Sequence, residues 1–235
     1  MECYLSRNYK ETNSAGNKAK TDMEEIMRSM GMRNVGLPQS HFHDPVRHFL
    51  ATLAGVVKSP FCLAKGDILV LQYPLKKYYE LVCDMAHASG AKVVTLIHDL
   101  GSFRRKALTV EREIVRLNHS DVVIAHNDNM CAWLRDNGCR SRLLPLGIFD
   151  YLTPSGVLTL HMPDSPYTVV YAGVLSPRKN AFLYQVGNVV RGYKVRLYGG
   201  GFDMRGAVHP ECFEQMGFVP SSQLIATAQG HFGLV

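Results

Sequence analysis

Two short apolar runs near the carboxyl end of the chain break into glycine where a β-strand would end. The first, TVVYAG, predicts a strand from Thr168 to Ala172, and the second, KVRLYGGG, predicts a strand from Lys194 to Tyr198. Residues 180–190 between them are expected to form a crossover helix. A βαβ unit of this kind requires parallel strands, and open α/β sheets bind ligands at the carboxyl ends of such strands.

The loop after the first of these strands carries two cations, Arg178 and Lys179, just before the expected helix. Most such pairs are solvated surface charges. At a helix start, however, backbone N–H groups and the helix dipole favour an anion, and two cations would add to that attraction. Three consecutive glycines after the second strand exceed what a turn needs and permit close approach of a ligand. The candidate anion-binding residues are Gly173, Arg178, Lys179, Asn180, Tyr198, Gly199, Gly200 and Gly201.

Two common nucleotide motifs are missing from the sequence. Met204 stands where the third glycine of a G-x-G-x-x-G fingerprint would be, which disfavours NAD and FAD. There is no G-x-x-x-x-G-K-[ST] phosphate loop, which argues against an ATPase. We therefore expect no bound cofactor.

Length and composition limit the class of protein. The 235 residues suffice for one large domain or two ordinary ones, and the net charge of +6 favours anionic partners. Without a helix-turn-helix signature or interleaved basic and aromatic residues, nucleic acid is not an expected partner. The six cysteines are dispersed, as is typical of reduced, buried thiols in a cytoplasmic protein. No export signal or membrane-spanning run is expected.

Apolar runs and helical patterns alternate along the first 147 residues, which predicts an α/β domain with a doubly wound parallel sheet. Proline-punctuated residues 148–166 are expected to be a linker, and residues 167–235 a second Rossmann-like domain that ends on its fourth strand and is therefore incomplete. The expected strands are 3–9, 33–37, 67–74, 92–100, 121–127, 142–146, 216–219 and 231–235; the expected helices are 22–30, 45–57, 77–89, 110–118, 129–137 and 221–228.

Polar residues at three further places are candidates for function. His98 and Asp99 end a buried strand, where α/β enzymes present polar chemistry, although an exposed loop pair is the simpler interpretation. HFHDPVRH (41–48) invites a metal site, but its spacing matches no zinc template, and Asp-Pro there is typical of a helix start. We expect no metal. A polar loop over 10–20 follows the first strand and would face an interdomain cleft; its candidate residues are Asn13, Ser14, Gly16, Asn17 and Lys18.

Several segments together resemble the GT-B glycosyltransferases, and most closely the bacterial galactofuranosyltransferase-like group. These segments are YLSRNYKETNSAGNKAKTDME, LIHDL, SDVVIAHN, LGIFDY, YAGVLSPRKN, YGGGFD and the terminal FGLV. The resemblance covers the whole chain. It implies two Rossmann-like domains facing a cleft, a nucleotide-sugar donor, UDP-linked, and a carbohydrate acceptor that is often lipid-linked.

Glycosyl transfer leaves a nucleoside diphosphate with developing negative charge, which enzymes stabilise with a metal on a D-x-D motif or with fixed cations and N–H groups. The sequence has no D-x-D, so we expect a metal-independent reaction, with Asp99 or His98 as base if the anomeric centre is inverted. A UDP-sugar epimerase or hydrolase and a non-catalytic nucleotide-sugar binding module remain the alternatives. An apolar stripe over 46–57 is either a packed face or a peripheral membrane contact.

Overall fold

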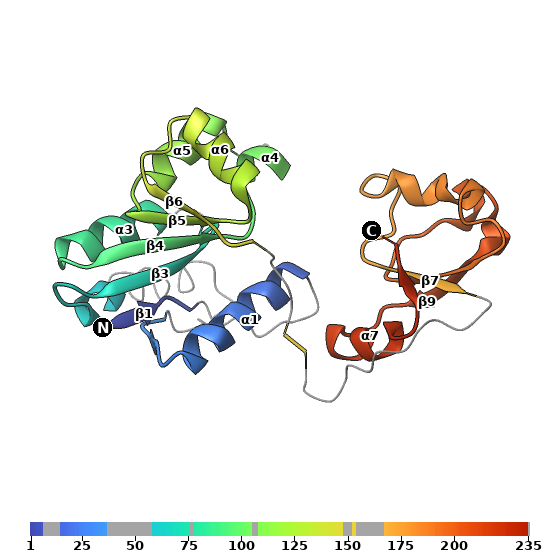
Figure 1. Ribbon diagram of the computed structural model, residues 1–235, viewed down its shortest axis with the longest axis horizontal. Helices are drawn as coiled ribbons and strands as arrows, with labels where there is room; N and C mark the ends of the chain where they lie inside the picture. Colours follow the sequence, from blue (N-terminus) through green and yellow to red (C-terminus); the bar gives the residue numbers. More distant parts are fainter. Residues whose placement is uncertain are drawn as a thin grey trace, which may run out of the picture. The chain divides into compact units, whose positions relative to one another are not determined.

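The computed structural model describes residues 1–6, 15–36, 58–75, 78–104, 108–147, 152–153 and 167–234. The chain divides into two compact units, Met1–Tyr151 and Leu152–Val235, each built on its own parallel sheet (Figure 1). Two parallel α/β sheets in one chain confirm the expected fold class.

The first unit contains a six-stranded sheet in which every neighbouring pair is parallel. The strand order is β2-β1-β3-β4-β5-β6, so the winding direction reverses between β1 and β3. That reversal is the switch point of a doubly wound sheet, where the carboxyl ends of the strands leave room for polar groups. The strands are β1 (Glu2–Tyr4), β2 (Arg33–Asn34), β3 (Ile68–Tyr73), β4 (Lys92–Ile97), β5 (Val122–Ala125) and β6 (Arg142–Pro145).

Helices lie on both faces of this sheet, with α1 on one side and α3, α5 and α6 on the other (Figure 1). Side-chain caps begin two of them: the Thr109 hydroxyl accepts from the Arg112 N–H at 3.3 Å, and the Asn127 amide oxygen accepts from the Met130 N–H at 2.9 Å. The helices are α1 (Ala15–Ser29), α3 (Tyr79–Ala88), α4 (Gly101–Arg104), α5 (Val110–Leu117) and α6 (Asp128–Asp136), with a 3-10 turn η1 (Ser59–Cys62).

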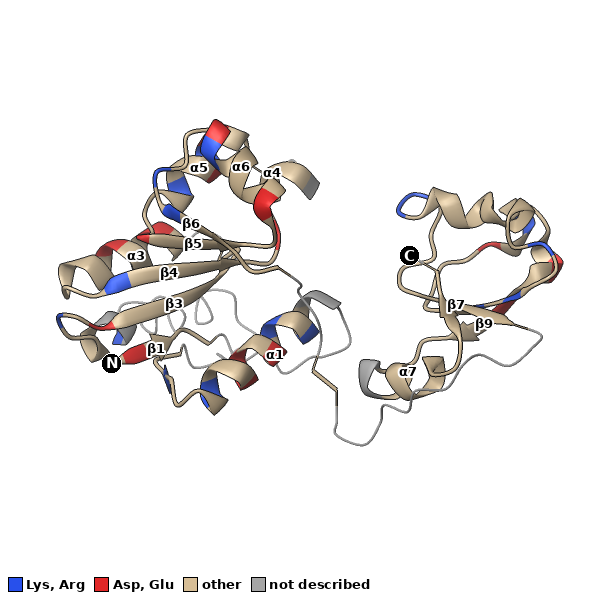
Figure 2. Ribbon diagram, viewed as in Figure 1, with Lys and Arg blue, Asp and Glu red and all other residues tan. Residues whose placement is uncertain are grey.

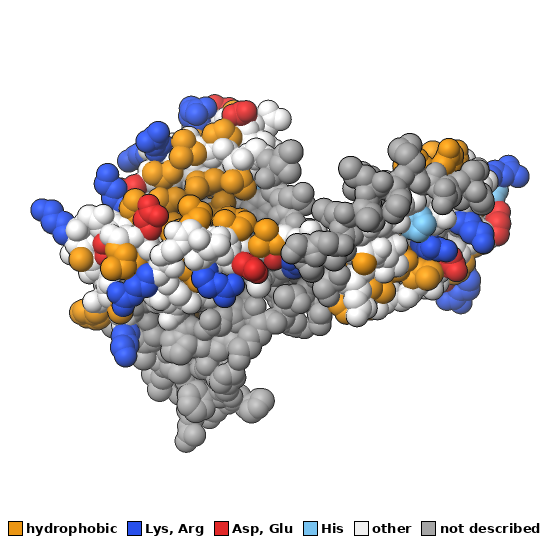
Figure 3. Space-filling model, turned by 60° about the horizontal axis from the view of Figure 1, so that its bottom comes forward, with side chains coloured by type: hydrophobic (Ala, Val, Ile, Leu, Met, Phe, Trp, Pro, Cys, Tyr) orange, Lys and Arg blue, Asp and Glu red, His pale blue; other side chains and the backbone are white. Residues whose placement is uncertain are grey.

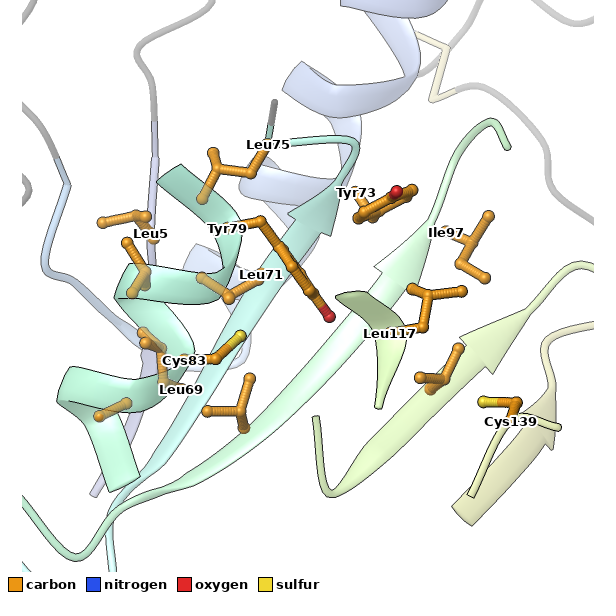
Figure 4. Packing of buried hydrophobic residues seen from close by; sticks show 14 of the residues in the cluster. Leu5, Leu69, Leu71, Tyr73, Leu75, Tyr79, Cys83, Ile97, Leu117 and Cys139 are labelled. Atoms are coloured by element: carbon orange, nitrogen blue, oxygen red, sulfur yellow. The ribbon is translucent and has the colours of Figure 1, made fainter. Parts of the chain in front are cut away.

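The core of the first unit lies between the sheet and α3, α5 and α6 (Figure 4). Tyr79 is fully buried there, and its hydroxyl is within 2.8 Å of the Thr95 hydroxyl and 2.6 Å of the Ser120 hydroxyl. The Thr95 and Ser120 hydroxyls are 2.7 Å apart, so the three groups satisfy one another in an apolar surrounding. Burial raises the pKa of the Tyr79 phenol.

The second unit contains a four-stranded parallel sheet in the order β10-β7-β8-β9. Its winding direction reverses between β7 and β10, which places a second switch point beside the glycine that ends β7. Leu175, Leu183, Val195 and Leu197 are fully buried in its core. Its elements are β7 (Thr168–Ala172), η3 (Ala181–Tyr184), η4 (Val186–Asn188), β8 (Lys194–Tyr198), η5 (Met204–Gly206), η6 (Pro210–Cys212), β9 (Phe213–Gly217), α7 (Ser221–Ala228) and β10 (Phe232–Gly233).

The crossover between β7 and β8 differs from the expected α-helix over 180–190, because it consists of the two short 3-10 turns η3 and η4. The carbonyl of Tyr184 accepts a hydrogen bond from the N–H of Val208 at 2.8 Å, so the partner of this carbonyl lies outside the crossover. A Cβ on Gly187 would lie 1.9 Å from the Val208 carbonyl oxygen. The crossover is therefore shaped by close packing of its backbone against the segment before β9.

The first helix and the cysteines can also be compared with the sequence predictions. The first helix begins at Ala15 rather than at residue 22, and the expected helix over 45–57 and the histidines of HFHDPVRH lie outside the described residues. Among the cysteines, Cys62 is exposed, whereas the other members of the set are buried free thiols. Burial raises the pKa of the Cys83 thiol to about 12, so it stays protonated at neutral pH.

The surface charges are spread rather than gathered. On the face drawn in Figure 3, Lys and Arg side chains stand along the edges of both units, with Asp and Glu among them. Among the described residues, no helix has the length and apolar character needed to cross a membrane.

Candidate functional site

The two glycine-ended strands of the second unit meet directly. The N–H of Gly173 donates to the Tyr198 carbonyl at 2.9 Å, and the N–H of Leu175 donates to the Gly200 carbonyl at 3.0 Å. Gly199 has a φ of 142°, and a Cβ placed on it would lie 1.9 Å from the Gly173 carbonyl oxygen. Only glycine fits at this position, because the neighbouring backbone occupies the place of any side chain. The structure thus brings the predicted loops 173–180 and 198–201 together at the carboxyl edge of the sheet.

A tyrosine from the crossover holds these two loops in place. The buried Tyr184 hydroxyl donates to the Leu175 carbonyl at 2.9 Å and accepts from the Asp203 N–H at 3.0 Å. One residue therefore fixes the loop after β7 and the loop after β8 with the same oxygen atom. Tyr184 is not among the residues that the sequence analysis selected, because its role depends on a contact between loops far apart along the chain.

Arg178 and Lys179 lie in a tight turn and are both exposed. The N–H groups of Lys179 and Asn180 donate to the Ser176 carbonyl at 3.1 and 3.0 Å, and the Asn180 side-chain amide donates to the Val174 carbonyl. These N–H groups are therefore already bonded, and η3 has only four residues. The expected anion site at an α-helix start is wrong in this respect. The two cations and Gly200 are exposed, and Figure 2 shows the basic residues of this unit in blue on its ribbon.

In the first unit, polar side chains gather where β3, β4 and β5 end. The Gln72 side chain, 3% exposed at the end of β3, donates from its amide nitrogen to the Lys20 carbonyl of α1 at 3.2 Å. Its amide oxygen lies 2.6 Å from Nε2 of His98. Next to them, Nε2 of His126 donates to the Ile97 carbonyl at 2.9 Å. His98 is thus joined to α1 through Gln72.

This hydrogen-bonding chain determines which nitrogen of His98 carries the proton. Because the Gln72 amide nitrogen donates to Lys20, its oxygen must accept, so Nε2 of His98 is the protonated nitrogen. Burial, with smaller contributions from Lys20 and His126, lowers the pKa of His98 to about 3. A neutral imidazole with so low a pKa is a poor general base at neutral pH.

The predicted polar loop after β1 is helical where it is described. Gly16, Asn17 and Lys18 belong to the first turn of α1, in which the Lys18 ammonium and the Asp22 carboxylate form an i,i+4 pair at 2.5 Å. Asp22 is 4% exposed, so this pair stabilises the helix in a partly buried setting. The assignment of these residues to a loop is wrong, because the charge pair extends the helix toward its amino end. Asn13 and Ser14 lie outside the described residues.

A buried carboxylate from α5 supports the loop that carries Asp99. Glu113 is fully buried, and it accepts hydrogen bonds from the N–H groups of Gly101 and Ser102, each at 2.8 Å. The sequence gives little sign of this role, since Glu113 is one of several charged residues in EREIVR. Among the described residues, no group of three His, Cys, Asp or Glu side chains is placed to hold a metal ion.

Two parallel doubly wound sheets, the second with glycine-rich loops at its carboxyl edge, define the GT-B class of fold. Residues 2–148 match the family described as "Glucosyltransferase 3-like, N-terminal domain", and the chain belongs to this family. It is 30% identical over 183 residues to the beta-1,6-galactofuranosyltransferase WbbI of Escherichia coli K12, an alignment that covers 73% of this chain and 54% of WbbI. It is 23% identical over 250 aligned residues to glucosyltransferase 3 of Streptococcus parasanguinis, covering 100% of this chain and 69% of that protein. The chain thus spans about half the length of the galactofuranosyltransferase.

Solved structures share the fold at low sequence identity. The lipopolysaccharide outer core galactosyltransferase WaaB, in its apo form, matches 99% of this chain and 72% of its own, with a TM-score of 0.63 and 11% identity. Anabaena HepE in complex with UDP matches 98% of this chain and 72% of its own, with a TM-score of 0.60 and 11% identity. These likenesses establish the GT-B architecture for this chain.

Proposed function

We propose that this protein is a glycosyltransferase that moves a hexosyl group, with galactofuranosyl as the candidate sugar, from a UDP-sugar to a carbohydrate or lipid-linked glycan acceptor. Family membership and the named activities of WbbI and glucosyltransferase 3 support the reaction class. The single observation that carries the donor assignment is the joined pair of glycine-rich loops with Arg178 and Lys179 exposed beside them. The UDP and UDP-glucose in two structures of HepE, which shares the fold, support a uridine nucleotide.

The donor diphosphate would lie against the exposed backbone at Gly200, where a ligand meets no side chain. Arg178 and Lys179 would supply the positive charge that the leaving diphosphate needs as the glycosidic bond breaks. The loops are fixed before the ligand arrives, because Tyr184 and the contact of Gly199 with Gly173 hold them. Such preorganised charge does the work that a metal ion does elsewhere, so the reaction is proposed to be metal-independent.

The acceptor would bind to the first unit near Asp99. If transfer inverts the anomeric centre, Asp99 takes the proton from the attacking hydroxyl, while neutral His98 accepts or donates hydrogen bonds without changing charge. Phe103 lies on α4, four residues after Asp99 in the chain. Its exposed ring offers an apolar surface for a sugar ring. If transfer retains the configuration, Asp99 serves acceptor binding alone.

Calorimetric titration with UDP tests the donor site. Lys179→Ala should weaken UDP binding by about 1–3 kcal/mol, the usual effect of losing a charge-assisted hydrogen bond. Lys194→Ala is the matched control, because it also removes one exposed positive charge. Lys194 is the first residue of β8, at the end of this strand opposite to the glycine-rich loop. Equal UDP affinity in the wild type and Lys179→Ala would contradict the assignment.

Product analysis then separates the alternatives. A transferase yields UDP only when a glycan acceptor is present, whereas a hydrolase releases sugar and UDP without one, and an epimerase converts the UDP-sugar with no UDP released. A non-catalytic binding module would bind UDP-sugar and release nothing. Transfer from UDP-galactofuranose but not from UDP-galactopyranose would support the galactofuranosyl assignment.

A further inference from the structure

The Glu113 carboxylate is fully buried in the first unit, beside the Tyr73 hydroxyl, which also interacts with the Arg116 side chain. It accepts hydrogen bonds from the N–H of Gly101 and the N–H of Ser102, both at 2.8 Å, and from the Tyr73 hydroxyl at 2.9 Å. Burying a carboxylate is costly even when it is well bonded, and an apolar side chain of similar size is often at least as stabilising. A role in stability alone therefore explains Glu113 poorly.

The two backbone groups that Glu113 holds lie just beyond Asp99 in the chain. Gly101 and Ser102 are the first residues of α4, immediately beyond Leu100. On the other side, the N–H of His98 donates at 3.0 Å to the carbonyl of Tyr73, the same residue whose hydroxyl donates to Glu113. The segment 98–102 is thus bonded to the Glu113 carboxylate beyond Asp99 and to the backbone of β3 before it. Figure 4 shows Tyr73 beside Ile97, the last residue of β4, and Figure 1 shows α4 beside α6, whose Trp133 contacts Phe103.

The short helix α4 is partly exposed. It has four residues, and Phe103 within it is 52% exposed, with its ring centroid 4.3 Å from that of Trp133 in an edge-to-face contact. Four residues form too few internal hydrogen bonds to be stable alone. The buried carboxylate supplies acceptors for two N–H groups that begin the helix, and this fixes where the strand-end loop turns.

We propose that Glu113 is a positioning residue for the transfer reaction, which holds the backbone of residues 98–102 so that Asp99 meets the acceptor hydroxyl. The proposal rests on the proposed function. Catalysis by a positioned group is sensitive to displacements of about 1 Å, which cost on the order of 100-fold in rate. Loss of the carboxylate therefore affects turnover more than donor binding, because the donor loops belong to the second unit.

Kinetics of two variants of the full chain test this role. Glu113→Gln keeps the shape of the side chain but turns an amide N–H₂ toward a backbone N–H, so the loop loses one of its fastenings. Tyr79→Phe is the matched control, because it removes buried hydrogen bonds to Thr95 and Ser120 in the same core and leaves the Glu113 carboxylate and its partners untouched. We expect Glu113→Gln to lower kcat roughly 10- to 100-fold with KM for the UDP-sugar nearly unchanged. Tyr79→Phe should also lower Tm but keep kcat within about threefold.

Amide hydrogen exchange makes the test independent of activity. In Glu113→Gln, exchange should quicken over 99–104 and stay unchanged in β3 and β4, whereas Tyr79→Phe should resemble the wild type over 99–104. Faster exchange together with normal kcat would overturn the positioning role. Unchanged exchange, or equal loss of kcat in both variants, would show that Glu113 is merely structural. If the wild type transfers no sugar, the proposed function fails, and the exchange result still decides whether Glu113 holds the loop.

Discussion

Replacing Tyr184 by phenylalanine removes one oxygen atom that serves two loops. Without it, the Leu175 carbonyl and the Asp203 N–H each lose a buried partner. An unsatisfied buried polar group costs about 1–3 kcal/mol, and water that enters the space recovers part of this, so we expect the second unit to lose about 2–4 kcal/mol. For a domain of 60–100 residues, each kcal/mol lowers Tm by roughly 4–8 °C.

Differential scanning calorimetry of the full chain measures the loss. Amide hydrogen exchange shows where in the protein stability is lost, because faster exchange is expected at the ends of β7 and β8 and not in the first unit. Tyr193→Phe is the control, since Tyr193 is 45% exposed in the same unit and loses the same atom. UDP affinity should also fall, as the loops are no longer held in advance of binding. A Tm change in Tyr184→Phe no larger than in Tyr193→Phe would refute the reasoning.

Four further predictions address the chemistry and the pH response. The pKa of His98 in the folded protein is about 3, below its value in the unfolded chain, so its contribution to stability is complete above about pH 6.5 and is lost as the pH falls toward 3. Urea unfolding at pH 7 and at pH 5 should therefore show that the free energy of unfolding falls, by at most roughly 1.4 kcal/mol per pH unit. The fall should be smaller in His98→Asn. Asp99→Asn should lower kcat more than UDP affinity, and equal losses in steady-state kinetics and calorimetry would mark it as a donor-binding residue. Transferase activity should survive EDTA, and an absolute need for Mn²⁺ or Mg²⁺ would contradict the metal-independent site. Anionic vesicles should sediment the protein at low salt and release it at high salt, whereas protein that stays in the supernatant at low salt has no peripheral contact.

Much of the fold follows from local patterns in the sequence. The run DILVLQYP predicts a strand buried on both faces, and β3 occupies 68–73 within it. Glycine after an apolar run marks the ends of β7 and β8, whose bounds match the prediction. Hydrophobic patterning and strand-ending glycine operate within a few residues, so they are visible without the tertiary structure.

The parts that sequence reasoning missed depend on contacts between distant residues. The crossover reads as a helix, yet the Tyr184 carbonyl bonds to Val208, and this competing contact decides its shape. Glu113 and Tyr184 look ordinary in their own segments, because their partners come from other loops. Gln72 differs from these two residues, because the sequence around it does indicate a role. An amide inside an apolar strand must find a hydrogen-bonding partner when it is buried.

The contact between Phe103 and Trp133 gives the protein an optical reporter of its own. Trp133 is the only tryptophan in the chain, and its ring lies edge-to-face against a ring four residues beyond Asp99. The emission of an indole depends on its immediate surroundings, so any movement of α4, or a sugar placed on Phe103, changes the intrinsic fluorescence of the whole protein. Acceptor binding is therefore open to measurement by stopped-flow fluorescence without an added label.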